Sequence, residues 1–230
     1  MTAHFPAAVL FDMDGTLVDT EPYWMTAERE LVVAYDGTWT AEDGLTLVGQ
    51  GLENSAAILQ SRGVDLTTSQ IIDHLTERVL AQAKDHIPWQ PGALELIASL
   101  RDAKIPLALV TMSMRPLAEH IVHASEEPLF DLIVSGGDVV NPKPHPEPYH
   151  RAADLLGVEI SECVAIEDSI PGLASAVASG ATVIGVPAHI ELAASDNYTL
   201  WESLAGRTIH DIRNLATSGE SRTIESEPTR

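Results

Sequence analysis

Five short runs of apolar residues stand out along the chain of 230 residues. They lie at 7–12, 105–111, 131–135, 163–167 and 182–186. Each run is apolar almost throughout, rather than alternating with polar residues, which is typical of strands that are covered on both faces. The pattern therefore predicts a buried, parallel sheet.

Segments with helical periodicity separate these runs, at 92–103, 115–124, 148–156 and 171–179. The last of them is rich in small residues and is followed by Gly180, a residue type that commonly ends helices. Strands that alternate with helices favour an α/β fold with a doubly wound, Rossmann-like parallel sheet.

Residues 20–86 interrupt this alternation. Their pattern predicts three or four helices, the clearest over 21–35 and 69–84, and no strong strand. We therefore expect a small helical domain of 20–86, inserted after the first strand of a core domain formed by 1–19 and 87–216. The polar residues 217–230 are predicted to form a disordered tail.

The charge balance narrows the possible partners. Thirteen Lys and Arg residues oppose 34 Asp and Glu residues, so the formal net charge is −21. Such a chain repels nucleic-acid phosphates and anionic membrane surfaces, and neither is an expected partner. The sequence contains no run of 18 apolar residues, so no membrane span is predicted. The single cysteine, Cys163, excludes an intrachain disulfide and favours a reducing, cytoplasmic location.

Two acidic pairs follow predicted strands. Asp12 and Asp14 end the first strand, and Glu167 and Asp168 end the fourth. The carboxyl ends of parallel strands meet at one edge of the sheet, so we expect the four carboxylates to converge there. A hard cation with oxygen ligands, Mg²⁺, would relieve their repulsion. The alternative is that Asp14 closes a turn and that Asp168 supports the cap of the next helix.

Two further strand-end features lie between the acidic pairs. Lys143 belongs to a segment with alternating prolines, which would hold its ammonium group in place beside the carboxylates. A polyproline ligand is the alternative, although the two-residue spacing contains no PxxP motif. Thr111 and Ser113 end the second strand, where hydroxyl and backbone N–H groups can bind phosphate oxygens. A purely structural threonine would fit the sequence equally well.

In this order the motifs resemble those of the haloacid dehalogenase superfamily, in its phosphatase and sugar phosphomutase branch. The resemblance covers about residues 7–187. It rests on FDMDGTLVDTE, on the strand end at Thr111, on Lys143 in KPHPEPY, and on IEDSIPGLASAVASGA. It implies a Rossmann-like core with an α-helical cap inserted after the first motif.

The resemblance also implies roles for individual residues. Asp12 would be the nucleophile and Asp14 the general acid and base. Thr111 would bind the transferring phosphoryl group, and Lys143 would neutralise charge on that group and on Asp12.

The implied cofactor is Mg²⁺. Asp12 and Asp168 would ligate it through their side chains, and Asp14 would do so through its backbone carbonyl. Glu167 would bind it through water or anchor its surroundings.

Comparison with the patterns of individual family members narrows the activities that this chain could have. Asp14 is the residue that a dehalogenase typically lacks, and a phosphonatase needs a cap lysine, for which Lys84 near the hinge is poorly placed. By local match, Trp24 and Leu52 stand where a β-phosphoglucomutase has a histidine and an arginine. We therefore expect a Mg²⁺-dependent phosphomonoesterase that acts through an aspartyl phosphate. A sugar phosphomutase is the alternative, and a catalytically silent binding protein a minor one.

The expected substrate is a small phosphorylated metabolite, a sugar or polyol phosphate. Glu21 would bond its hydroxyls, Ser113 would contribute to its binding, and Arg115 would meet an anionic group, although Arg115 fits a solvated helix start as well. We expect a monomer or a weak homo-oligomer.

Overall fold

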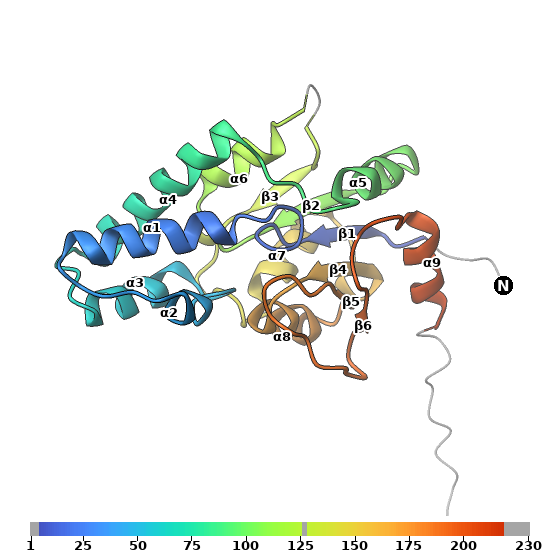
Figure 1. Ribbon diagram of the computed structural model, residues 1–230. Coiled ribbons are helices and arrows are strands. Elements are labelled where there is room, and N and C mark those ends of the chain that lie inside the picture. The colour runs from blue at the N-terminus through green and yellow to red at the C-terminus, as the bar shows by residue number, and fades with distance from the viewer. Residues whose placement is uncertain (1–4, 126–127, 219–230) are drawn as a thin grey trace, which may run out of the picture.

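Six parallel strands form one sheet in the order β3-β2-β1-β4-β5-β6 (Figure 1). The computed structural model describes residues 5–125 and 128–218. The strands are β1 Ala8–Phe11, β2 Leu107–Val110, β3 Leu132–Val134, β4 Cys163–Glu167, β5 Thr182–Gly185 and β6 Thr199–Leu200. All five predicted runs are strands. The sequence did not predict β6, because a two-residue strand shows no periodicity.

Helices cover both faces of the sheet. On one face Val9 and Phe11 pack with α5 and α6, and on the other Ala8 and Leu10 pack with α7 and α8. This double burial explains why the strands are apolar throughout. The core helices are α5 Ala93–Asp102, α6 Arg115–Val122, α7 Glu147–Leu156, α8 Ile170–Ser179 and α9 Ile209–Ser218, with short 3-10 turns η1 Gly136–Asp138 and η2 Ile160–Glu162.

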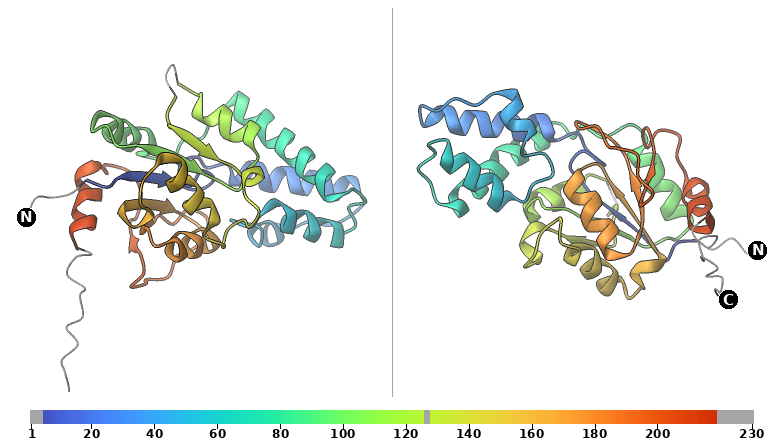
Figure 2. Two further views of the ribbon diagram at one scale, coloured as in Figure 1. Left: turned by 180° about the vertical axis from the view of Figure 1, so that it is seen from behind. Right: turned by 90° about the horizontal axis from the view of Figure 1, so that it is seen from below.

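Four helices follow β1 and lie beyond the carboxyl ends of the strands (Figures 1 and 2). They are α1 Glu21–Ala34, α2 Ala41–Leu45, α3 Leu52–Ser61 and α4 Thr68–Asp85. We call residues 21–85 the cap. It packs on the core through α4 and α6, where the His120 ring nitrogen Nε2 lies 3.2 Å from the carbonyl oxygen of Ala83. The inserted helical cap and the parallel α/β core confirm the predicted fold class.

Local signals set several helix ends. The Thr67 hydroxyl accepts a hydrogen bond from the Gln70 N–H at the start of α4. The Ser169 hydroxyl accepts one from the Gly172 N–H at the start of α8, and Gly180 ends that helix with a left-handed φ of 89°. The predicted role of Gly180 is thereby confirmed, and Ser169 caps the start of the helix.

The C-terminal boundary differs in part from the expectation. Helix α9 extends to Ser218, so it includes the first residues of the predicted tail of 217–230, and the remainder lies outside the described residues. The division at 19/20 and 86/87 stays a prediction. Within the ranges 5–125 and 128–218, no helix is both long and apolar enough to cross a membrane.

Candidate active site

A cavity of about 70 Å³ lies between the cap and the carboxyl edge of the sheet. The sheet order places β1 between β2 and β4, so the residues that follow these three strands meet at its core side. The cavity is lined from the core by Asp12, Asp14, Thr111, Met112, Ser113, Lys143, Asp168 and Ser169, and from the cap by Glu21, Trp24, Glu28, Leu47, Gly49, Gln50, Leu52 and Ser55.

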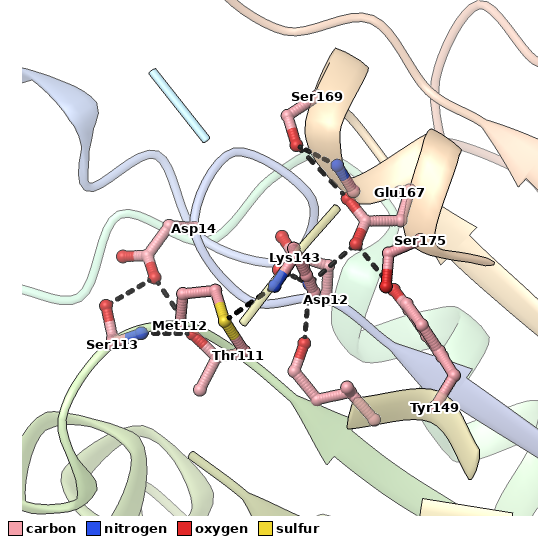
Figure 3. A network of polar contacts seen from close by, with 12 residues as sticks. Asp12, Asp14, Thr111, Met112, Ser113, Lys143, Tyr149, Glu167, Ser169 and Ser175 are labelled. Carbon is pink, nitrogen blue, oxygen red and sulfur yellow. Dashed lines mark hydrogen bonds and ion pairs between the residues drawn. The ribbon is translucent and has the colours of Figure 1, made fainter. Parts of the chain in front are cut away.

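Lys143 joins the two acidic pairs (Figure 3). Its ammonium nitrogen lies 2.7 Å from Asp12 Oδ1, 2.6 Å from Glu167 Oε1 and 2.8 Å from the Val110 carbonyl oxygen. The Tyr149 hydroxyl donates to the same Glu167 oxygen at 2.5 Å. Lys143 is 5 % exposed and Glu167 fully buried, so this ion pair is screened little by solvent.

Burial governs the protonation equilibria at this edge. It raises the pKa of Asp12, although the Lys143 ammonium opposes the shift. Burial, and then the charges of Asp12 and Glu167, raise the pKa of Asp168 well above its usual range. Burial alone would lower the pKa of Lys143, but the carboxylates of Asp12 and Glu167 outweigh it and raise that pKa. One ammonium group therefore does not offset the cost of ionising all the carboxyl groups at this edge.

The donor set fits a Mg²⁺ ion. Carboxylate oxygens of Asp12, Glu167 and Asp168 lie within 4.8 Å of one another, and oxygen is the ligand type that Mg²⁺ prefers. Glu167 is already bound by Lys143 and Tyr149, which favours the role of an anchor over that of a direct ligand. Asp12 and Asp168 face the cavity and are left as the side chains best placed to hold the ion.

Asp14 is held by four donors. Oδ1 accepts hydrogen bonds from the Thr20 hydroxyl at 2.5 Å and from the Trp24 indole N–H at 3.0 Å. Oδ2 accepts them from the Ser113 hydroxyl at 2.7 Å and the Thr111 hydroxyl at 3.2 Å. These donors come from the hinge, the cap and the end of β2, so the position of Asp14 depends on both parts of the molecule.

Two glycines allow the acidic loops to approach each other. Gly15 has a left-handed φ of 87°, and a Cβ there would collide with the carboxylate of Asp168. A Cβ at Gly172 would collide with the carboxylate of Glu167. These residues are glycine because neighbouring carboxylates occupy the space of a side chain, and Gly15 also because of its backbone conformation.

The structure brings most of the expected site residues together. Asp12, Asp14, Thr111, Ser113, Lys143, Asp168 and Glu21 all line the cavity. Arg115 is not among its lining residues; it pairs with Asp138 at 2.5 Å and donates to the Ile133 carbonyl at 3.3 Å. Its expected contact with substrate stays a prediction.

Sequence reasoning missed several contributors. The hydrogen bond from Trp24 to Asp14 was not predicted, and Glu28 and Tyr149 were not considered. For the cap residues a signal was present, because Glu21, Trp24 and Glu28 are spaced by three and four and share one face of a helix. No comparable signal pointed to Tyr149, whose partner Glu167 is 18 residues away.

Comparisons with known proteins identify the family of the chain. Residues 9–186 match the family model of the haloacid dehalogenase-like hydrolases. The chain is 35 % identical to the protein CbbY of Cereibacter sphaeroides over 207 residues, which are 82 % of this chain and 89 % of CbbY. It is 34 % identical to hexitol phosphatase A of Escherichia coli over 185 residues, 78 % of this chain and 82 % of that enzyme.

Two further matches are a solved structure and a relative that is much longer than this chain. The crystal structure of CbbY from Rhodobacter sphaeroides in complex with phosphate matches with a TM-score of 0.78 and 32 % identity, covering 87 % of this chain and 96 % of that one. The bifunctional riboflavin kinase/FMN phosphatase of Arabidopsis thaliana is 30 % identical over 79 % of this chain, which spans about half (48 %) of that protein. The chain is therefore an enzyme of the haloacid dehalogenase-like hydrolase family and groups with its phosphatases.

Proposed function

We propose that the protein is a Mg²⁺-dependent phosphomonoesterase that hydrolyses a small sugar or polyol phosphate in the cytoplasm. One observation carries the proposal: Asp12 and Asp14 border the same cavity, and a buried ammonium group, Lys143, lies 2.7 Å from Asp12. The similarity to hexitol phosphatase A supports the substrate class.

The chain's own residues account for the proton and phosphoryl transfers. An oxygen of Asp12 attacks phosphorus, and the bond from phosphorus to the alcohol oxygen breaks. Asp14 gives its proton to that departing oxygen and then accepts a proton from the water that hydrolyses the aspartyl phosphate. Lys143 offsets the charge that the incoming phosphate and Asp12 bring together.

A bound Mg²⁺ would be held by Asp12 and Asp168 and would reduce the repulsion between carboxylate and phosphate. Removing the ion with excess chelator is expected to abolish turnover, and added Mg²⁺ to restore it. Full activity after exhaustive chelation would contradict the metal requirement.

The decisive experiment measures hydrolysis of p-nitrophenyl phosphate with Mg²⁺. We expect turnover by the native protein and loss of at least about 10³-fold in Asp12→Asn, because the amide keeps the shape of the side chain but is not a nucleophile. Circular dichroism and Tm show whether the variant is folded. Substantial phosphatase activity of a folded Asp12→Asn variant would exclude Asp12 as the nucleophile.

The sugar phosphomutase alternative is tested separately. A mutase must hold the second phosphate of a bisphosphate intermediate, yet Lys143 is the single Lys or Arg among the described cavity-lining residues. Trp24 and Leu52 both line the cavity, where a mutase has cationic or hydrogen-bonding residues. We expect β-glucose 1-phosphate to release inorganic phosphate without glucose 1,6-bisphosphate. Predominant formation of glucose 6-phosphate that depends on the bisphosphate would establish the mutase instead.

A further inference from the structure

Glu28 lines the same cavity as Asp12, but the proposed chemistry does not use it. It lies on α1 seven residues after Glu21, which places it two helical turns, about 10 Å, further along the cap helix. Trp24 lies between them on the same face of α1. The face therefore runs from the acid–base residue Asp14, which Trp24 contacts, to a second carboxyl deep in the cap.

The Glu28 side chain is buried without adequate partners. The residue is 4 % exposed, and its Oε2 atom has no hydrogen-bond partner. The buried Trp39 indole N–H also lacks a hydrogen-bond partner of good geometry, but it interacts with the Glu28 carboxyl and opposes the rise of its pKa. An indole has a single N–H, whereas a carboxyl group has two oxygens, so even a direct contact with Trp39 would leave Glu28 with unused acceptor sites.

A buried carboxyl group lowers the stability of the folded protein unless a partner forms hydrogen bonds with it. Burying a carboxyl group without partners destabilises a protein, and an apolar residue of similar size would avoid the cost. Burial, and then the charge of Glu21, raise the pKa of Glu28 to about 8. Near neutral pH this carboxyl can thus donate one hydrogen bond and accept others, as a hydroxyl partner requires.

The charge around the cavity limits what this partner can be. Lys143 is the single Lys or Arg among the described lining residues, and it is engaged by Asp12 and Glu167. The cap side instead presents Glu21 and Glu28. A second phosphate or a carboxylate at that end would face acidic groups without a cation, whereas a neutral hydroxyl would find donors and acceptors.

From this geometry we propose that Glu28 is a specificity-determining residue that binds a hydroxyl group remote from the phosphate, so that the enzyme selects neutral polyol monophosphates over bisphosphates and phosphorylated acids. The inference rests on the proposed phosphatase function and specifies its substrate class. It assigns to Glu28 the recognition of the leaving alcohol and not a step of the chemistry.

Substrates that differ in the number of hydroxyl and phosphate groups remote from the reacting phosphate test this assignment. We would measure kcat/KM for p-nitrophenyl phosphate, glycerol 1-phosphate, sorbitol 6-phosphate and fructose 1,6-bisphosphate with the native protein and with Glu28→Leu and Glu28→Gln. Glu28→Leu is expected to lower kcat/KM for sorbitol 6-phosphate by about 10- to 100-fold, the effect of one lost hydrogen bond to a polar group. The loss for p-nitrophenyl phosphate should be at least about tenfold smaller, and Glu28→Gln should fall between Leu and the native residue.

Glu30→Gln is the matched control. Glu30 is an exposed glutamate on the same helix and pairs with Arg78 at the surface, so its substitution should leave all four substrates unaffected. Glu28→Leu should also raise Tm, because it removes a buried, unsatisfied carboxyl. A purely structural role of Glu28 predicts a lower Tm and equal proportional losses on all substrates, and equal losses would overturn the inference.

A binding measurement separates failure of the inference from failure of the proposed function. In the Asp12→Asn background, calorimetric titration with sorbitol 6-phosphate should give a Kd at least about tenfold higher when Glu28→Leu is added. An unchanged Kd, or a native preference for fructose 1,6-bisphosphate, would refute the role of Glu28 and leave the phosphatase intact. Absence of p-nitrophenyl phosphate turnover by the native protein would refute the proposed function itself.

Discussion

Asp14 shows how individual hydrogen bonds prepare the proposed acid–base residue. Both of its carboxylate oxygens accept two hydrogen bonds, one of them from the Trp24 indole at 3.0 Å. Trp24 belongs to the cap whereas Asp14 belongs to the core, so this bond transmits the position of the cap to the reacting group. Trp24 acts through Asp14 and is a positioning residue.

Trp24→Phe is expected to lower kcat by about tenfold, because it removes one donor to a carboxylate and keeps most of the apolar volume. KM should change less than kcat, because Trp24 acts on the position of Asp14. Trp24→His, which retains an N–H donor, should recover part of the rate. Trp201→Phe is the control, because Trp201 is buried against Arg207, away from the cavity. An unchanged kcat in Trp24→Phe would show that the bond is dispensable.

At the scale of elements, helix α1 contains two buried glutamate side chains. Glu21 and Glu28 lie on one face of the helix, 8 % and 4 % exposed. Burial is the main cause that raises the pKa of Glu21 to about 7 and that of Glu28 to about 8. Both carboxyl groups therefore release their protons at higher pH in the folded state than in the unfolded state. The stability of the cap should depend on pH as a result.

The sign of that sensitivity follows from the pKa of Glu28. Its ordinary value is 4.5 and its folded value about 8, so the folded state keeps a proton that the unfolded state has already released. The free energy of unfolding should therefore fall as pH rises from about 5 to 8, and the stabilisation should be largest below pH 4.5. At about 1.4 kcal/mol per pKa unit, the contribution of Glu28 is on the order of a few kcal/mol.

Urea unfolding of the native protein and of Glu28→Gln across this pH range measures the effect. The difference in unfolding free energy should shift in favour of Glu28→Gln as pH rises, since the amide does not ionise. Glu30→Gln should show a difference that hardly depends on pH, because Glu30 is exposed. A difference for Glu28→Gln that stays constant from pH 5 to 8 would contradict the buried ionisation.

At the scale of the whole molecule, the cap and the core are in close contact around the cavity. Residues of the cap and of the core both line the cavity, so the position of the cap sets the room that a sugar phosphate finds there. The cap loop at Gly49 lies directly against the α8 turn: a Cβ at Gly49 would be 2.5 Å from the Cβ of Ser169. Closure therefore depends on the absence of a side chain at Gly49.

Gly49→Ala is expected to lower kcat/KM by about 10-fold or more, because the added methyl group holds the cap away from Ser169 and lets water into the site. Gly63→Ala is the control for backbone strain. Gly63 also has a positive φ, 102°, but a Cβ there would meet nothing within 4 Å. Both variants should lose some stability, measured as Tm, and only Gly49→Ala should lose activity. Similar kinetics for the two variants would mean that the contact does not limit closure.

Much of this arrangement could be predicted from local patterns. The five apolar runs, the small-residue helix ended by Gly180, and the interruption of the alternation at 20–86 each have a cause within a few residues of sequence. The acidic pairs could also be placed at one edge of the sheet, because parallel strands all end on the same side. The two-residue strand β6 could not be predicted, since its pairing with β5 depends on the rest of the sheet.

The sequence by itself determined which acidic and basic residues gather at the edge of the sheet. Asp12, Asp14, Lys143 and Asp168 follow elements whose burial the chain encodes locally, and a parallel sheet must bring such positions together. Only the tertiary structure decided which groups form hydrogen bonds or ion pairs with one another and which line the same cavity. The bond from Trp24 to Asp14 and the contact of Gly49 with Ser169 both depend on how the cap lies on the core. That placement results from packing between residues far apart in the chain, and no local periodicity records it.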